Sequence, residues 1–181
     1  SPAYTWLLVG CALLMACHSA TCTYMIHIVG KVGGSESMMG SALAVAAFLE
    51  LPAMGLFSRV RRKVPLAWLL IFCAAFFVIR AGLFWAARSV PVLYLAAALD
   101  FFEYGIFIPA TVYYVAEHID PANQVKGQSL MGMATTGVGS AFGNFVSGQL
   151  LDRAGVSGML LFCSACAAVG LLVVIYAVRR K

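Results

Sequence analysis

Two acidic side chains lie three residues apart inside a long apolar stretch of the chain. Asp100 and Glu103 occur in the segment LAAALDFFEYGIFIPA, which spans residues 95–110. Residues three positions apart share one face of a helix, so both carboxyl groups can point toward the same partner. Ionisable groups at membrane depth cost about 2.5–3.5 kcal/mol on insertion scales, and they usually pair within a bundle or take part in proton relays.

Arg80 lies in the preceding apolar stretch and is the expected partner of these acids. At about 1.5 Å per residue, Asp100 is expected about 14 Å and Arg80 about 9 Å from the same membrane face, with Glu103 near the midplane. We therefore expect Arg80 to hold Asp100 ionised. Glu103 is expected to gain and lose a proton, because an uncompensated acid in a low-dielectric site keeps its proton more readily. The alternative is a static structural ion-pair network.

Four more polar side chains within apolar stretches are candidates for substrate binding: Glu50, His18, Asn144 and Gln149. Glu50 lies two residues before Pro52, which removes a backbone hydrogen bond and can kink a helix. Each candidate also has a structural alternative. Glu50 can be satisfied by neighbouring donors, His18 can be a packing residue, and the two amides can bond across helices. We expect no metal site and no cofactor.

The composition places these residues in a membrane. The chain has 181 residues, of which 62% are hydrophobic and 10% are charged, and its mean hydropathy is +0.93. A soluble domain has roughly 25% charged residues, so this chain cannot cover an aqueous surface. We therefore expect an integral membrane protein.

Six apolar segments are each long enough for a transmembrane helix, which needs about 20 residues. They span residues 3–29, 36–58, 65–86, 91–117, 125–151 and 157–178. Barrel strands would be about 10 residues long and would alternate in polarity, a pattern that these segments lack. The expected fold class is an all-α membrane bundle of six helices in one domain over residues 1–181.

The basic residues predict the orientation of the bundle in the membrane. With an even number of helices, both termini share one side with the segment RVRRK and the loop HIDPANQVK. That side has eight basic residues: Arg59, Arg61, Arg62, Lys63, Lys126, Arg179, Arg180 and Lys181. The other side has three: Lys31, Arg88 and Arg153. This imbalance predicts cytoplasmic termini, in what we expect to be a bacterial inner (plasma) membrane, and it explains the basic loops without a nucleic-acid partner.

Glycines and cysteines within the apolar segments indicate packing. The segment GQSLMGMATTGVGSAFGNFVSG contains a GxxxG pattern at Gly139 and Gly143, and small residues let helices approach closely in lipid. Tight static packing and a smooth helix that slides or bends during gating are the two interpretations. The six cysteines, including the CSAC segment at 163–166, are expected to be small apolar packing residues.

Several of these segments resemble the C-terminal six-helix half of a major facilitator superfamily transporter. LFSRVRRKVP at 56–65 is similar to the short basic loop between the second and third helices of that half. DPANQVKGQSLMGMATTGVGSAFGNFVSGQLLDRAG is similar to its fourth-to-fifth loop and glycine-rich fifth helix. Within the superfamily, Arg80 and the acid pair resemble lactose permease and its oligosaccharide and nucleoside:proton symporter relatives, which carry an arginine on the ninth helix and an i, i+3 ionisable pair on the tenth. Lactose permease has histidine then glutamate at that pair, where this chain has Asp100 then Glu103.

The resemblance implies roles for individual residues. Glu103 would take the proton-site role and Arg80 the role of its charge partner, and Glu50 lies on the helix that bears the sugar-binding acid of that group. It also implies transport instead of catalysis. We expect half of a proton-coupled carrier that moves a small polar solute, such as a sugar or nucleoside, by alternating access around a midplane site. The expected partners are that solute, protons, the lipid bilayer and an N-terminal six-helix half.

Two other interpretations remain open. The chain can be a half-size carrier that pairs with a second copy of itself. It can also be a membrane scaffold or receptor that transports nothing, in which case the buried charges are structural.

Overall fold

The computed structural model describes residues 2–180, which form helices and contain no strand. The α-helices are α1 (Pro2–Thr23), α2 (Met25–Lys31), α3 (Glu36–Arg61), α4 (Leu66–Ala86), α5 (Val90–Ala98), α6 (Tyr104–His118), α7 (Gln124–Gly132) and α8 (Ser140–Arg179). The shorter elements are the 3₁₀ turns η1 (Leu99–Phe101) and η2 (Pro121–Asn123) and the π-helix η3 (Met133–Gly139). Lys181, which was counted among the basic residues, lies outside the described residues.

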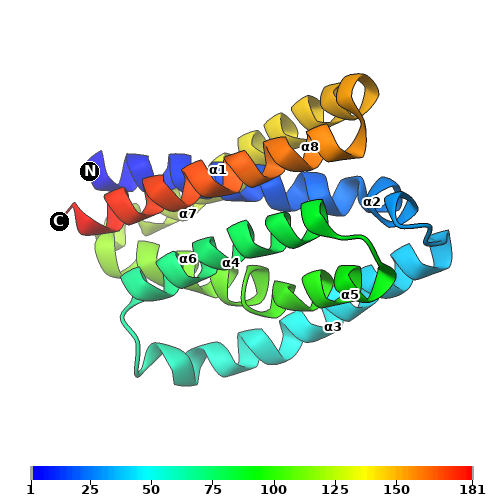
Figure 1. The fold of residues 1–181 in the computed structure, drawn as a ribbon. Coiled ribbons are helices and arrows are strands. Elements are labelled where there is room, and N and C mark those ends of the chain that lie inside the picture. Colours follow the sequence, from blue (N-terminus) through cyan, green and yellow to red (C-terminus); the bar gives the residue numbers. More distant parts are fainter. Residues whose placement is uncertain (1, 181) are drawn as a thin grey trace.

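Five helical segments of residues 2–180 have the length and composition to cross a membrane. They are Pro2–Thr23, Glu36–Arg61, Leu66–Ala86, Val90–His118 and Pro121–Arg179. The last has 59 residues, and a straight helix of that length would reach about 90 Å, some three times the thickness of the hydrocarbon core. The chain instead turns back at Gly155, where φ is +67°, as the yellow and orange limbs of α8 show (Figure 1). The expected fifth and sixth spans lie on either side of this glycine.

Local sequence explains most helix ends. Ser35 accepts a hydrogen bond from the backbone N–H of Met38 and so caps the start of α3, as its residue type favours. Pro65 immediately precedes α4, and Pro91 stands in the first turn of α5, where its missing N–H costs nothing. Gly33 adopts a φ of +77° just after α2, a conformation that glycine reaches without strain.

Two expected helices are interrupted. The expected helix 3–29 is divided at Tyr24, between α1 and α2. The expected helix 91–117 is divided more sharply, because α5 ends at Ala98 and α6 begins at Tyr104, with η1 between them. The acid pair therefore lies at a break within a span and not on a continuous helix.

The helices form one bundle with both termini at the same end (Figure 1). The connections α3–α4 and α6–α7 lie at that end too, as the alternation of spans requires. The outer surface carries large apolar side chains, and Phe48, Leu51 and Trp68 are 72%, 69% and 60% exposed. Surfaces of this kind are unfavourable in water and suit lipid.

The glycine-rich segment packs closely on α1. A Cβ atom added at Gly139 or Gly143 would collide with the backbone of Ala12 or Ala16, whereas one at Gly132 or Gly137 would meet nothing within 4 Å. The GxxxG pair therefore lets two helix backbones touch, which is the tight-packing interpretation of this segment. All six cysteines are free, and all but Cys22 are buried.

We expect Gly143→Ala to lower the free energy of unfolding by about 1–3 kcal/mol, the usual cost of overpacking. The measurement is unfolding of the micelle-solubilised protein by titration with sodium dodecyl sulfate. Gly132→Ala is the matched control and should be neutral or stabilising, since alanine favours helix over glycine. Equal stability of the two variants would contradict the close contact between α1 and α8.

Candidate functional site

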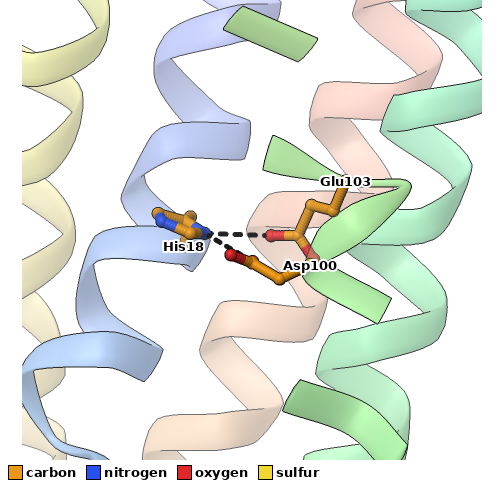
Figure 2. A group of neighbouring side chains, drawn as sticks. All are labelled: His18, Asp100 and Glu103. Atoms are coloured by element: carbon orange, nitrogen blue, oxygen red, sulfur yellow. Dashed lines mark hydrogen bonds and ion pairs between the residues drawn. The ribbon is translucent and has the colours of Figure 1, made fainter. Parts of the chain in front are cut away.

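Four ionisable side chains meet inside the bundle. His18 comes from α1 and Arg80 from α4, while Asp100 and Glu103 come from the break between α5 and α6. Arg80, Asp100 and Glu103 are at most 2% exposed, and His18 is 12% exposed at its side chain. Figure 2 shows both carboxyl groups pointing toward the imidazole of His18. We refer to these four residues as the charge cluster.

Arg80 contacts both acids. Its Nη1 donates a hydrogen bond of 3.0 Å to Oε1 of Glu103 and lies 3.3 Å from Oδ1 of Asp100. Arg80 therefore pairs with Asp100, as expected, but the expectation that this would leave Glu103 without a full partner is wrong. The break between α5 and α6 changes the depths that a continuous helix would have imposed, so the guanidinium reaches both carboxylates.

The Nδ1 atom of His18 can take either of two roles in the cluster. It lies 3.1 Å from Oε1 of Glu103, 3.6 Å from Oδ1 of Asp100 and 3.2 Å from Nη1 of Arg80. A protonated Nδ1 donates to Glu103, whereas an unprotonated Nδ1 accepts from Arg80. The position of one proton thus decides which hydrogen bond His18 makes.

The charges of the cluster do not balance without a proton. Two carboxylates face one guanidinium, so the fully ionised acids with neutral His18 would leave one net negative charge in a buried site. An uncompensated buried charge is costly. One additional proton, on His18 or on either acid, makes the cluster neutral.

Neighbouring side chains hold His18 and Arg80 in place. The His18 ring stacks on Tyr104 with centroids 4.5 Å apart and planes 4° apart, and Arg80 lies over the Phe84 ring at 5.1 Å. Cys22 places its Sγ 3.8 Å from Nε2 of His18. Three buried polar atoms of the cluster have no hydrogen-bond partner within residues 2–180: Nε of Arg80, Oδ1 of Asp100 and Oε2 of Glu103. Each of them could form one more hydrogen bond.

Glu50 belongs to the same neighbourhood. It is half-buried on α3, which packs against η1 and α6 next to the acid pair. Gly105 allows this approach, because a Cβ atom there would lie 2.6 Å from the Cβ of Ala53 and 3.4 Å from the Cα of Glu50. A third acid thus lies near the charge cluster, on a different helix.

The two amide candidates lie outside the charge cluster. Asn144 donates from Nδ2 to the hydroxyl of Ser19 at 3.0 Å, and its backbone carbonyl accepts from the Tyr24 hydroxyl at 3.0 Å. Asn144 therefore links α8 to α1 by hydrogen bonds, which is the structural role expected as the alternative to substrate binding. Gln149 is exposed on α8 and makes no side-chain hydrogen bond to another described residue.

The ligating atoms of His18, Asp100 and Glu103 lie within 4.8 Å of one another, which is a spacing that a metal ion could bridge. Nη1 of Arg80 lies 3.0–3.3 Å from the same carboxylate oxygens. A metal ion at that point would have to compete with the guanidinium, which already supplies positive charge.

Sequence reasoning proposed His18 as a substrate contact and overlooked two residues near it. Tyr104 follows Glu103 directly, and Cys22 lies one helical turn after His18. The i, i+4 spacing of His18 and Cys22 is a signal that they share a face of α1. The stacking of His18 on Tyr104 joins residues that are 86 positions apart, and no local pattern indicates it.

Comparison with known proteins gives one family for nearly the whole chain. The model of the MFS_1 like family matches residues 1–176. A maltose permease of Geobacillus stearothermophilus is 26% identical over 175 residues, which is 97% of this chain and 44% of that protein. A putative sugar efflux transporter of Deinococcus radiodurans is 22% identical over 181 residues, covering 99% and 46%. The chain thus spans less than half the length of these relatives.

We expect Arg80→Gln to lower the free energy of unfolding by about 3–5 kcal/mol, because it leaves two buried carboxylates without their guanidinium. Adding Glu103→Gln should recover part of this loss, since fewer buried charges then lack a partner. Unfolding of the micelle-solubilised protein by sodium dodecyl sulfate measures both effects. The control is Arg88→Gln, which removes an exposed arginine and should change little. A double variant no more stable than Arg80→Gln would disprove the pairing.

Proposed function

The chain belongs to the MFS_1 like family of the major facilitator superfamily, and on this basis we propose that it forms half of a proton-coupled secondary transporter. We propose a small polar solute of the sugar type as its substrate, since two relatives are named for sugars. The two halves of such a carrier would enclose the solute near the midplane and expose it to each side in turn.

The observation that carries proton coupling is the composition of the charge cluster. Two acids, one guanidinium and one imidazole, buried together at a break within a span, are neutral with one added proton and negative without it. Discontinuous helices at the midplane are a recurrent feature of ion and substrate sites in transporters. A site with one exchangeable proton can couple its occupancy to a conformational change if the two conformations bind that proton with different affinity.

We assign Glu103, Asp100 and Arg80 to proton coupling and add His18 to them. In the protonated state, Nδ1 of His18 or a carboxyl group carries the proton, and Arg80 remains bonded to Glu103. Loss of the proton leaves a net negative charge, and Nδ1 can then accept from Arg80. This change of hydrogen bonds alters how α1, α4 and α6 are held together, because the partners come from those helices or their junctions.

The substrate contacts are assigned by their position around this cluster. Glu50 is the strongest candidate, because it is half-buried on α3, which packs against the 3₁₀ turn that carries Asp100. A hydroxyl-rich solute bonded to Glu50 would therefore influence the proton on the cluster. Asn144 and Gln149 remain weaker candidates, because Asn144 is already engaged with Ser19 and neither amide joins the cluster.

We propose six membrane crossings, with the two limbs of α8 around Gly155 belonging to the last two. The end that contains both termini would face the cytoplasm, as the excess of basic residues at that end favours. An N-terminal six-helix half or a second copy of the chain would complete the carrier by contacting polar and apolar side chains that this half leaves exposed. A bacterial inner membrane is the proposed location.

Glu103→Gln tests the proposed function. In proteoliposomes that contain the complete carrier, we expect the variant to lose uphill accumulation of labelled maltose driven by a proton gradient. Exchange of internal for external maltose should persist, because glutamine mimics the protonated acid and leaves the shape of the site nearly unchanged. Glu36→Gln, the same change at an exposed residue of α3, should behave as the wild type.

Proton-driven accumulation by Glu103→Gln would show that Glu103 is not essential for coupling. Loss of both accumulation and exchange with intact folding would assign Glu103 to substrate binding instead. A wild-type protein that moves neither maltose nor protons in any of these assays would favour a scaffold or receptor.

Single cysteines at Arg61 and Asn123 test the orientation, in a protein whose native cysteines have been replaced. Arg61 ends α3 and Asn123 lies in η2, between α6 and α7; the α3–α4 and α6–α7 connections both lie at the end that contains the termini (Figure 1). Membrane-impermeant thiol reagents should label both in inside-out vesicles and neither in intact cells. Labelling of either position from outside intact cells would overturn the proposed orientation.

A further inference from the structure

The last turns of α3 border a basic groove. Its volume is about 670 Å³, and its polar lining comes from Ser58, Arg59 and Arg62. Neither arginine makes an ion pair or a side-chain hydrogen bond with another of residues 2–180. Arg61 differs from both, because it pairs with Glu117 and lies over the Tyr113 ring at 4.9 Å. Arg61 is thus paired within the chain, whereas Arg59 and Arg62 keep free donors beside a groove.

An apolar groove adjoins the basic one. It has a volume of about 520 Å³ and is lined only by apolar side chains of α3, α4, η1 and α6, among them Val60, Trp68 and Phe72. Leu56 and Phe101 line both grooves. The two grooves therefore form one surface that is basic at the end of α3 and apolar along its side.

The dimensions of this surface match one leaflet of a bilayer. It follows α3 from Pro52 to Arg62, a length of about 15 Å at 1.5 Å per residue. Half of the hydrocarbon core is also about 15 Å thick. Arg59 and Arg62 lie at the end of the candidate membrane span Glu36–Arg61, where lipid phosphates are expected. The apolar groove extends along α4 as far as Ala75, in the middle of the span Leu66–Ala86.

We propose that these adjoining grooves bind one anionic phospholipid. Arg59 and Arg62 bond its phosphate, since arginine presents donors that suit phosphate geometry, and an acyl chain lies in the apolar groove against Trp68 and Phe72. A soluble anion would leave the apolar groove unfilled, and an acidic peptide would have to place its backbone in hydrocarbon, where unpaired polar groups are costly. The proposal does not depend on proton coupling.

Trp68 provides a direct probe of the site. Trp6→Phe and Trp85→Phe leave it as the sole tryptophan. The purified chain is then placed in bilayers in which either phosphatidylglycerol or phosphatidylcholine carries bromine near the headgroup end of its acyl chains. Bromine quenches tryptophan on contact, so competition between the two lipids gives their relative affinity at Trp68. We expect phosphatidylglycerol to be preferred, by about fivefold for each arginine involved.

Arg59→Gln with Arg62→Gln should abolish this preference. The matched control, Lys63→Gln with Lys126→Gln, removes two exposed charges from the same end of the bundle without altering the groove, and it should retain the preference. Equal loss in both double variants would show diffuse surface attraction and overturn the proposal. Equal quenching by the two lipids in the starting protein would also overturn it. Displacement of brominated phosphatidylglycerol by free glycerol phosphate would assign the arginines to a soluble anion instead.

Discussion

An arginine at membrane depth can be held only if the bundle supplies negative charge around it. Two carboxylates supply this negative charge to Arg80. Because they carry one negative charge more than the guanidinium balances, the site needs one added proton to be neutral. A low-dielectric interior makes each imbalance costly. The same requirement brings α1, α4 and the α5–α6 junction together at one point, so the arrangement of these helices and the chemistry of the site depend on one interaction.

The other packing features allow the helices to converge there. Gly143 lets the backbones of α8 and α1 touch, and Gly105 lets the start of α6 approach α3 near Glu50. A methyl group at either position would separate helices that carry the cluster or border it. Because lipid supplies no hydrophobic force between helices, close van der Waals contact of this kind is a principal source of their association.

Helix α3 joins two chemically different regions of the molecule. Glu50 lies where α3 packs against the start of α6, close to the charge cluster, whereas Arg59 and Arg62 border the groove at the end of the same helix. Few residues of α3 are buried, so this helix is held mainly by its contacts with α5, η1 and α6. A ligand on its exposed side and a proton in the cluster would therefore act on the same loosely packed element.

The membrane class, the positions of most helices and the identity of the charged residues follow from the sequence, because apolar length and isolated charges are local properties. The pairing within the site does not. Residues 99–103 contain neither glycine nor proline. Gly105 and Pro109 follow them, but they do not fix where the helix breaks, and a continuous helix favoured Asp100 alone as the partner of Arg80, whereas Arg80 contacts both acids. The role of His18 also depends on tertiary structure, since its partners are 62–86 positions away. Sequence determined which charges lie in the apolar segments, and only the packing of α1 and α4 against the α5–α6 junction decided which of them contact one another.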